Sequence, residues 1–334
     1  MQKHEQGKTS VMAALAGNVF ITLIKTVAAI SSGSVSMFAE SVHSFADTLN
    51  QALLLIGIQR SKKPADDIRG YGYGIERFFW SLVSACGVLF IGAGISVYHS
   101  INSLLHISHE AAAFSLLGII VLLVALVIEG ATLWIALTEL RNGEKFSREL
   151  FQEADPVLLA VIYEDGVAVC GVIFALIAQG VTYLTGNAVY DAIGGIAVGL
   201  ILGVLAIMLI IKNHKYIIGK ALDEDIGADI IEALERDPCV EKVIEFKSAA
   251  IDVNKYRIFA SVEWNGSPLY EEIYGEGDLQ EEFNDIKDSF KEFTKLMFRT
   301  TDRIPRLVGN RIAVIEKNIT AEFPQIAYVD IEIN

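Results

Sequence analysis

The sequence predicts an α-helical membrane protein with six transmembrane helices and a C-terminal cytoplasmic α+β domain. Two global values favour a membrane protein: 52% of the 334 residues are hydrophobic, and the mean hydropathy is +0.43. Apolar blocks of about 20 residues or more, each long enough to cross a bilayer, occur six times. The predicted spans are 10–31, 35–58, 78–104, 114–139, 156–180 and 188–212. The predicted domains are therefore a transmembrane domain, 1–212, and a soluble domain, 213–334.

The positions of Lys and Arg predict the orientation in the membrane. Basic residues precede the first span and follow the second, fourth and sixth spans, whereas the loops near 32–34, 105–113 and 181–187 contain none. Loops with an excess of Lys and Arg lie on the cytoplasmic side. Both termini are therefore predicted to be cytoplasmic, in a cell (inner) membrane. Residues 1–9 are polar and the first apolar block is full length, so no cleavable signal peptide is expected.

The soluble domain is predicted to contain two helices and three strands in the order αββαβ. Apolar residues at helical spacing, alternation, and the breaks at Pro238 and Pro324 define them. The expected elements are a helix at 225–236, strands at 240–252 and 255–265, a helix at 304–323 and a strand at 326–333. Between the second strand and the last helix lies an acidic, aromatic insertion near 266–303, with an amphipathic helix and no assigned role.

The charge of the soluble domain argues against nucleic acid as a partner. Residues 213–334 contain 25 Asp and Glu against 15 Lys and Arg, which gives −10 of the chain's net −14. A surface of this sign repels phosphate backbones and anionic lipid headgroups. We expect this domain to serve mainly in dimerisation.

The second predicted span contains a histidine and an aspartate, His43 and Asp47, four residues apart. That spacing puts both side chains on one helix face, one turn apart. Ionisable groups are costly in hydrocarbon, so they usually mark an ion or proton pathway. Imidazole together with carboxylate suits a divalent transition metal such as zinc.

The fifth predicted span supplies the expected partners, Glu164 and Asp165. Counted from the cytoplasmic side, Asp165 and the His43/Asp47 pair come to a similar depth in antiparallel helices. Adjacent helical residues point about 100° apart, so both acids cannot aim straight at one ion. Asp165 is favoured as the direct ligand because the small Gly166 follows it, and Glu164 is the weaker candidate. The alternative is that these acids are buried partners of a basic group such as Lys25.

Among the other polar residues within the predicted spans, Glu40 and Asn50 each have two alternative roles. Glu40 is either an acceptor that orients the imidazole of His43 or a solvated group near the span's end, and Asn50 is either a ligand or an interhelical hydrogen-bonding residue. Lys25 and Glu129 are expected to form a structural ion pair, either with each other or with an acid of the candidate site. Asp191 is expected to act at the start of the sixth span.

Several motifs resemble those of the cation diffusion facilitators, the zinc-transporter family, and specifically its branch with HxxxD in the second span. The resemblance covers roughly residues 10–260. Ala39 to Gln51 matches the pattern AE-x-x-HS-x-x-DT-x-NQ. Further matches are Gly72 to Trp80, the triplet Tyr163-Glu164-Asp165, and Asp191 to Gly195.

The resemblance implies a ferredoxin-like cytoplasmic domain, a homodimer, and proton-coupled export of divalent metal ions from the cytosol. The metal ion is then cargo, and no cofactor is expected. His43, Asp47, Asp165 and Glu164 are the implied metal ligands. Better-known zinc members carry HxxxD in the fifth span, where this chain has Val161 four residues before Asp165. Zinc is the first expectation, and manganese, iron or cobalt would also suit one His with carboxylates.

Two other functions compete with export. One is a family member that does not transport and serves as a scaffold or partner subunit; the complete set of candidate ligands argues against it. The other is a membrane metalloenzyme, which would need a catalytic base beside an open metal position. No motif of the HExxH kind occurs in the sequence, so an enzyme is not expected.

Overall fold

The computed structural model describes residues 2–106, 116–141, 156–269, 283–284 and 286–334. The chain divides into two compact units. The helical bundle comprises Met1–Lys62 and Glu76–His214, and the tail domain comprises Lys63–Ile75 and Lys215–Asn334. The loop 63–75 thus belongs to the tail domain, although in the sequence it joins two helices of the bundle.

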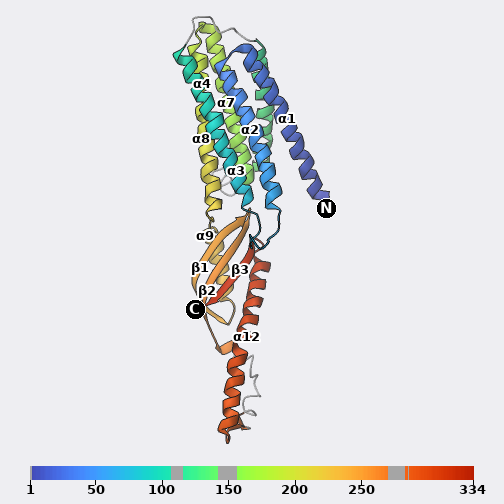
Figure 1. Ribbon diagram of the computed structural model, residues 1–334, viewed down its shortest axis with the longest axis vertical. Coiled ribbons are helices and arrows are strands. Elements are labelled where there is room, and N and C mark those ends of the chain that lie inside the picture. Colours follow the sequence, from blue (N-terminus) through green and yellow to red (C-terminus); the bar gives the residue numbers. More distant parts are fainter. Residues whose placement is uncertain (1, 107–115, 142–155, 270–282, 285) are drawn as a thin grey trace. The chain divides into compact units, whose positions relative to one another are not determined.

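The bundle consists of long helices that run side by side (Figure 1). They are α1 (Gln2–Ser32), α2 (Val35–Ser61), α3 (Glu76–Gly87), η1 (Val88–Ala93), α4 (Gly94–Leu105), α5 (Leu116–Arg141), α7 (Pro156–Thr185) and α8 (Val189–Ile217). The short π-helix η1 joins α3 and α4 into one continuous segment. Gly33 and Gly186, with φ of 64° and 66°, end α1 and α7 in the left-handed conformation that glycine adopts without strain.

Four helical segments of the described residues are long and apolar enough to cross a membrane. They are Glu76–Leu105, Leu116–Thr138, Ile162–Thr185 and Val189–Ile217. The apolar part of α1, Gly17–Ser32, is shorter. α2 is not among the four, and its first half contains several Ser residues together with Glu40, His43 and Asp47. The protein is therefore an integral membrane protein, and its candidate ligands lie on a long bundle helix that is not among these four.

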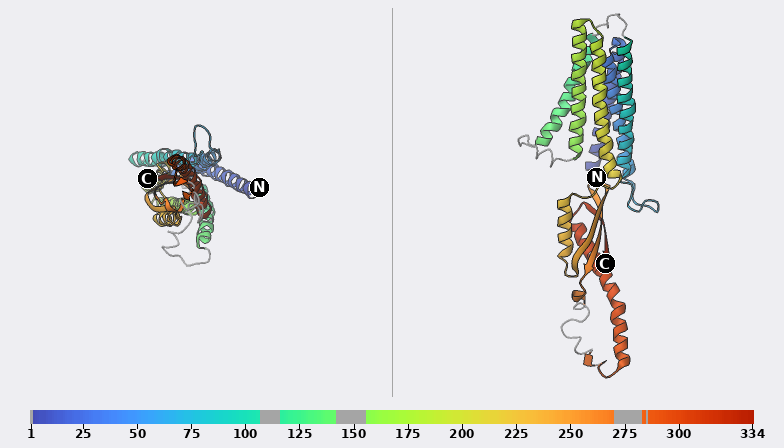
Figure 2. Two further views of the ribbon diagram at one scale, coloured as in Figure 1. Left: turned by 90° about the horizontal axis from the view of Figure 1, so that it is seen from below. Right: turned by 90° about the vertical axis from the view of Figure 1, so that its left-hand side faces the viewer.

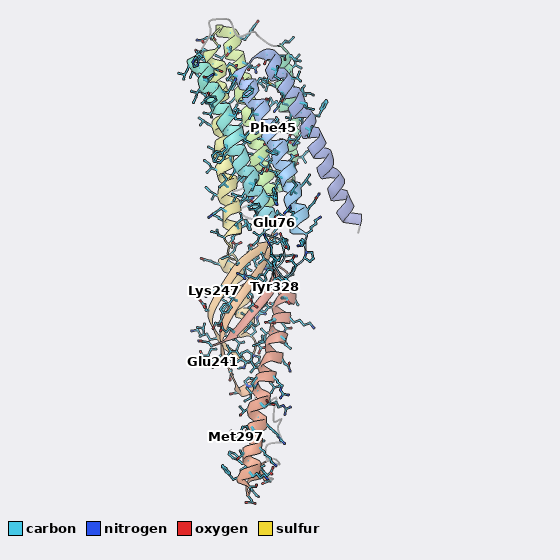
Figure 3. All side chains as sticks on the ribbon, in the orientation of Figure 1. Phe45, Glu76, Glu241, Lys247, Met297 and Tyr328 are labelled. Atoms are coloured by element: carbon cyan, nitrogen blue, oxygen red, sulfur yellow. The ribbon has the colours of Figure 1, made fainter. Side chains whose placement is uncertain are left out.

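The bundle buries several charged and polar groups and exposes many large apolar side chains. Lys25 and Glu40 are completely buried, and His43 is 2% exposed. On the outside, Phe45 of α2 is labelled in Figure 3, and large apolar side chains such as Phe20 and Val27 of α1 are more than 60% exposed. This distribution fits a lipid environment, in which apolar surface needs no cover and polar groups turn inward.

Small residues let α8 approach its neighbours closely. A Cβ added at Gly194 would lie 2.2 Å from the Cβ of Ala178 on α7, and one at Gly195 would lie 2.3 Å from the hydroxyl of Ser100 on α4. Only glycine permits these distances. Small residues at helix contacts are the common means of association in membranes, where no hydrophobic force drives helices together.

Asp191 joins the start of α8 to the start of α2. Its carboxylate accepts hydrogen bonds from the hydroxyl of Ser34 at 2.9 Å, from the backbone N–H groups of Val35 and Ser36, and from the Ser36 hydroxyl. The N–H groups at a helix start lack partners within the helix, and a negative charge there is favourable. Asp191 was expected to act at the start of its own helix, α8. In the structure its carboxylate stabilises the start of α2.

The tail domain contains a three-stranded sheet with two helices against it. The elements are α9 (Glu224–Glu235), β1 (Val240–Asp252), β2 (Lys255–Trp264), α12 (Phe290–Glu322) and β3 (Ile326–Ile333). The strand order is β1-β2-β3, with β1 and β2 antiparallel and β2 and β3 parallel. Ile230, Leu234, Ile258, Val262 and Ile319 are central to its apolar core and at most 2% exposed.

The last helix is longer than the sequence predicts. A helix was expected from residue 304, next to Pro305, but α12 begins at Phe290 and includes Pro305 in its interior. Much of the second half of the insertion near 266–303 is therefore part of this helix, whereas residues 270–282 and 285 lie outside the described residues. The N-terminal half of α12 extends past the sheet, and Met297 on it is half exposed (Figures 2 and 3).

The loop 63–75 packs on the sheet of the tail domain. The ring of Tyr71 meets that of Tyr328 at 5.1 Å between centroids, and the guanidinium of Arg257 lies 4.8 Å from the Tyr71 ring. A Cβ added at Gly74 would lie 2.4 Å from the carbonyl oxygen of Ile251. The chain that follows α2 is therefore held by contacts with all three strands.

Candidate functional site

The candidate metal ligands of α2 lie against each other inside the bundle. The Nε2 atom of His43 is 3.1 Å from Oδ2 of Asp47, with the His43 side chain 3% exposed and that of Asp47 35% exposed. The spacing of four residues produces this contact directly, because it is one turn of helix. The Nδ1 atom of His43 is buried and has no hydrogen-bond partner among the described residues. The pair thus joins a buried imidazole to a partly accessible carboxylate.

The acids of α7 lie near this pair without joining it as ligands. Glu164 interacts electrostatically with Asp47 and Asp165, and Asp165 interacts with Asp47 in turn. Within the described residues, however, no group of three or more His, Cys, Asp and Glu side chains comes close enough together to hold a metal ion. The carboxylates of α2 and α7 therefore interact electrostatically, but in this conformation they lie too far apart to bind one metal ion together.

Polar side chains of neighbouring helices hold these acids. Asn50 of α2 accepts a hydrogen bond from the hydroxyl of Ser84 on α3 at 2.8 Å, and its side chain also lies close to Glu164. The Thr132 side chain of α5 lies close to Asp165. Asn50 thus acts here as an interhelical hydrogen-bonding residue, one of the two roles expected for it.

The π-helical turn η1 packs beside the candidate ligands. A Cβ added at Gly92 would lie 3.4 Å from the Cβ of Ala46, the residue before Asp47. π-Helical turns inside α-helices are frequent at functional sites. Here the turn places a glycine opposite α2, which leaves room for this helix beside the candidate site.

A second buried cluster contains three charged side chains from three helices. The ammonium of Lys25 on α1 lies 2.8 Å from Oε1 of Glu129 on α5 and 3.0 Å from Oε2 of Glu40 on α2. We call these three residues the lysine triad. Of the two ion pairs expected for Lys25 and Glu129, the structure has the one that they form with each other. Glu40 is completely buried against Lys25 and so occupies neither of the two positions expected for it.

The position of Glu40 was not predicted from the sequence, because both roles expected for this residue considered α2 alone. Its nearest expected neighbour was His43, one turn away on the same helix. The signal that could have found the triad is the position of the charges: Lys25 is the lysine in the middle of a predicted span, and it has to be matched with acids from any helix. Lys25 takes two of them, so Glu164 and Asp165 are not its hydrogen-bonded partners.

The loop 63–75 contains acids but no histidine. Lys63 and Tyr73 donate hydrogen bonds to Oδ2 of Asp66, and the backbone N–H groups of Ile68 and Arg69 donate to Oδ1. These donors, Lys63 first, hold the pKa of Asp66 well below its usual range. Asp66 therefore shapes the loop, with both of its oxygens already used.

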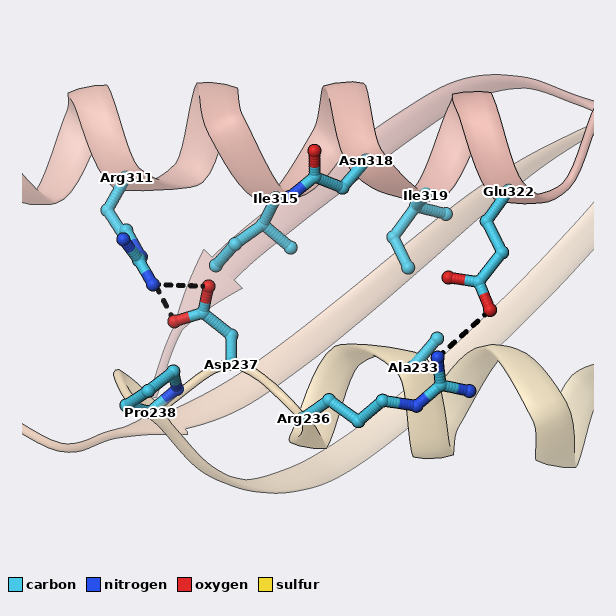
Figure 4. A pocket seen from close by; sticks show the side chains of 9 residues that line it. All are labelled: Ala233, Arg236, Asp237, Pro238, Arg311, Ile315, Asn318, Ile319 and Glu322. Carbon is cyan, nitrogen blue, oxygen red and sulfur yellow. Dashed lines mark hydrogen bonds and ion pairs between the residues drawn. The ribbon is translucent and has the colours of Figure 1, made fainter.

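A cavity of about 280 Å³ lies between α9 and α12 in the tail domain (Figure 4). The carboxylate of Asp237 binds Arg311 through both oxygens, at 2.9 and 3.1 Å, and Arg236 lies 3.0 Å from Glu322. The two arginines and the two acids that line this cavity form ion pairs with each other. It is a cleft between packed helices, braced by two ion pairs.

Comparisons with known proteins agree on one family. The sequence profile of the cation efflux transmembrane domain matches residues 11–218. The chain is 34% identical over 330 residues to the proton-coupled zinc antiporter SLC30A9, mitochondrial, of Xenopus laevis, and 32% identical to the human protein of that name. These alignments cover 97% of the chain and 59% and 58% of the relatives. Metal tolerance protein C4 of Arabidopsis thaliana is 30% identical, with 98% of the chain and 74% of that protein covered.

The chain therefore spans a little under three fifths of the length of the zinc antiporters that it matches. The matched profile covers the bundle, and the pairwise alignments cover nearly the whole chain, tail domain included.

Proposed function

The chain belongs to the cation efflux family, and we propose that it exports divalent transition-metal ions from the cytoplasm in exchange for protons. Zinc is the proposed physiological cargo, and manganese, iron or cobalt is the alternative. The observation that carries this proposal is the contact of His43 with Asp47 inside a bundle whose outer surface is apolar. The names of the relatives, a proton-coupled zinc antiporter and a metal tolerance protein, support it.

The proposed ligands of the transported ion are His43, Asp47 and Asp165, with Glu164 as a fourth or alternate ligand. The electrostatic contacts between the acids of α2 and α7 support this set. One imidazole with two or three carboxylates matches the preferences of zinc and also of manganese, iron and cobalt. The separation of the acids in the present conformation indicates that α7 must approach α2 when an ion enters.

Exchange for protons follows from the chemistry of these ligands. A divalent cation needs ionised carboxylates and a neutral imidazole, so it competes with protons for the same atoms. Histidine titrates near neutral pH. A site that opens outward takes up protons and releases the metal ion, and its return in the protonated form completes the exchange by alternating access.

The proposed topology has six spans with both termini in the cytoplasm, in a cell (inner) membrane. The basic residues of alternate loops support it. The proposed role of the tail domain is to hold a homodimer together as a ferredoxin-like module. Its αββαβ element order supports the fold assignment, and its acidic surface argues against docking on anionic lipid.

The test is zinc flux in liposomes that contain the purified chain and a pH gradient. His43→Ala and Asp47→Ala each remove a proposed ligand, so we expect flux to fall by more than about 100-fold, since loss of outer partners of a metal site alone costs 10–100-fold. His106→Ala is the matched control, because this exposed histidine at the end of α4 lies outside the site. Flux of wild-type size from Asp47→Ala would refute the proposal.

Wild-type protein that binds zinc but moves none would instead favour a scaffold or partner subunit. Competition among zinc, manganese, iron and cobalt in the same vesicles identifies the cargo. Zinc is supported if it displaces the other three at equal concentration. A site that prefers a harder metal would show manganese uptake that zinc inhibits only weakly.

A further inference from the structure

The N-terminal half of α12 has an apolar stripe that is not part of the core of the tail domain. Its members follow one another at intervals of three, four, three, four and three residues. They are Phe290, Phe293, Met297, Thr300, Ile304 and Leu307. This spacing is the heptad pattern of coiled coils, which places all of these side chains on one narrow side of the helix. We call these residues the α12 seam.

The α12 seam is exposed on a firmly held helix. The large side chains at its first, second, third and fifth positions are between 41% and 84% exposed, and Met297 is labelled in Figure 3. Further along the same side of α12, Ile315 and Ile319 are buried in the core of the tail domain. Arg311 pairs with Asp237 at 2.9 Å. The C-terminal half thus anchors the helix, and the N-terminal half continues its apolar side past the sheet (Figure 2).

The residues that could disturb a helix pair do not disturb the seam. Pro305 and Gly309 lie on other sides of the helix. Thr300 is the polar member of the seam, and its hydroxyl donates a hydrogen bond to the backbone carbonyl of Leu296 at 3.0 Å. It therefore brings no unsatisfied donor into an apolar contact.

The charges of this half favour a second copy of the chain as the partner. Beside the seam, between residues 294 and 308, there is one charge: these positions are Thr294, Leu296, Thr301, Arg303 and Val308. Opposite charges at such positions select a different helix as partner, and this chain has no such pattern there. Two identical seams can therefore meet without repulsion.

The other charges of this half lie away from the seam. They are Lys291, Glu292, Lys295, Arg299, Asp302 and Arg306. If the seam rested on a membrane, these cations would point away from the lipid headgroups, whereas a helix that binds a membrane surface uses its cations to contact anionic lipid. The arrangement thus fits a helix as partner better than a lipid surface.

We propose that the α12 seam pairs with the same seam of a second copy of the chain as a two-stranded coiled coil. The inference rests on the homodimer of the proposed function and assigns it a specific contact. The seam covers about two and a half heptads, fewer than the three or four of a self-sufficient coiled coil. Pairing therefore depends on the high effective concentration of two chains that are held in one membrane.

The test is disulfide crosslinking of the full chain in lipid vesicles, with the native Cys86, Cys170 and Cys239 replaced by alanine. Met297→Cys places a thiol on the seam, and the control Lys295→Cys places one on an exposed position of the opposite side. A disulfide needs two Cα atoms within about 7 Å. We therefore expect at least about tenfold more covalent dimer from Met297→Cys if the pair is parallel. For an antiparallel pair, the same excess is expected when chains with Met297→Cys are mixed with chains with Thr300→Cys.

Two phenylalanines provide a matched comparison on the same helix. Phe293→Glu puts a charge into the seam from both copies, so the yield of covalent dimer should fall by at least about tenfold, because like charges across an interface repel. Phe298→Glu changes a side chain that is 74% exposed but lies off the seam, and the yield should stay unchanged. Equal losses from both variants would overturn the proposal and indicate that exposed aromatic surface in general, as in docking on lipid, makes the contact.

The remaining outcomes separate this proposal from the proposed function. An amine-reactive crosslinker reports the homodimer independently of the seam. A dimer detected by this reagent, with no covalent dimer from the seam cysteines alone or mixed, would overturn the pairing and leave the homodimer in place. Zinc flux in the same vesicles tests export separately, and its absence would refute the proposed function without bearing on the pairing.

Discussion

The interiors of the bundle and of the tail domain differ in how they treat charge. The tail domain has a continuous apolar core of residues such as Ile230, Leu234 and Ile258, and its charges lie outside. The bundle has buried apolar clusters as well, but it also buries charged groups and hydroxyls, and many of its large apolar side chains face outward. The difference follows from the solvent: water makes burial of apolar groups favourable, whereas lipid makes it nearly neutral and makes exposed polar groups expensive.

This contrast shows where specificity comes from in each unit. In the tail domain, many similar apolar contacts add up, and no single pair decides the fold. In the bundle, a few polar contacts join particular pairs of helices. They are the contacts of Asp191 with the start of α2, of Asn50 with Ser84, and of Lys25 with two acids. Asn50 and Lys25 interact with acids of the candidate site, so substitutions at these two residues are expected to affect both stability and the proposed transport.

The largest effect on stability is expected for Lys25→Met. Two carboxylates would then remain buried without their cation, which costs about 3–5 kcal/mol. The measurement is the unfolding free energy of the full chain in detergent at neutral pH. The triple variant that also carries Glu40→Gln and Glu129→Gln removes the unmatched charges and should recover most of the loss. Equal stability of the single and triple variants would contradict the contrast drawn above.

A cavity in the apolar core of the tail domain is expected to have the next largest effect. Ile258→Ala removes a side chain that is 1% exposed and should destabilise this domain by about 3 kcal/mol. Ile244→Ala on β1, where the side chain is 49% exposed, is the control and should cost less than about 0.5 kcal/mol. Hydrogen exchange of the β2 amides reads out this domain alone. Similar losses from both variants would argue against a conventional core.

The smallest effect is expected for a charge at the edge of that core. Partial burial, and then Asp330 of β3, raise the pKa of Glu316 on α12 above its usual value. For an acid this means that ionisation costs stability, so the favourable contribution exists at low pH and is lost as the pH rises through the raised pKa. Glu316→Gln should therefore stabilise the tail domain by up to about 0.5 kcal/mol at pH 7.

At pH 4 the gain from Glu316→Gln should disappear, because the native carboxyl group is then largely protonated. Thermal unfolding of the two proteins at both pH values provides the measurement. Glu322→Gln serves as a control of opposite sign, since Glu322 pairs with Arg236 and gains nothing from neutralisation. A gain from Glu316→Gln that is the same at pH 4 and pH 7 would show that its cause is not ionisation.

The secondary structure of the tail domain was largely predictable because its patterns are local. The strands β1 and β3 begin and end at the predicted residues, and β2 ends one residue earlier. The start of α12 was missed because two helices were predicted, one within the insertion and one from residue 304, where the structure has a single helix. A proline inside a helix removes one hydrogen bond and crowds the preceding turn, but the amphipathic segment from Phe290 continues through it.

The candidate site was predictable only in its local part. The spacing of His43 and Asp47 in the sequence is enough to bring them together, and the structure confirms that contact. Asp165 and Glu164 remain predicted ligands, because their place beside the pair depends on the approach of α7 to α2. No spacing within one helix encodes that distance.

The sequence by itself determined the membrane character of the chain, its family, the positions of the strands, and the contact of His43 with Asp47. Each depends on composition or on residues a few positions apart. Only the tertiary structure decided that Lys25 holds Glu40 as well as Glu129, that Asp191 caps α2, and that the loop 63–75 packs on the sheet. These contacts join residues from 15 to more than 250 positions apart. Their partners are chosen by charge and by fit in three dimensions, which a one-dimensional pattern does not contain.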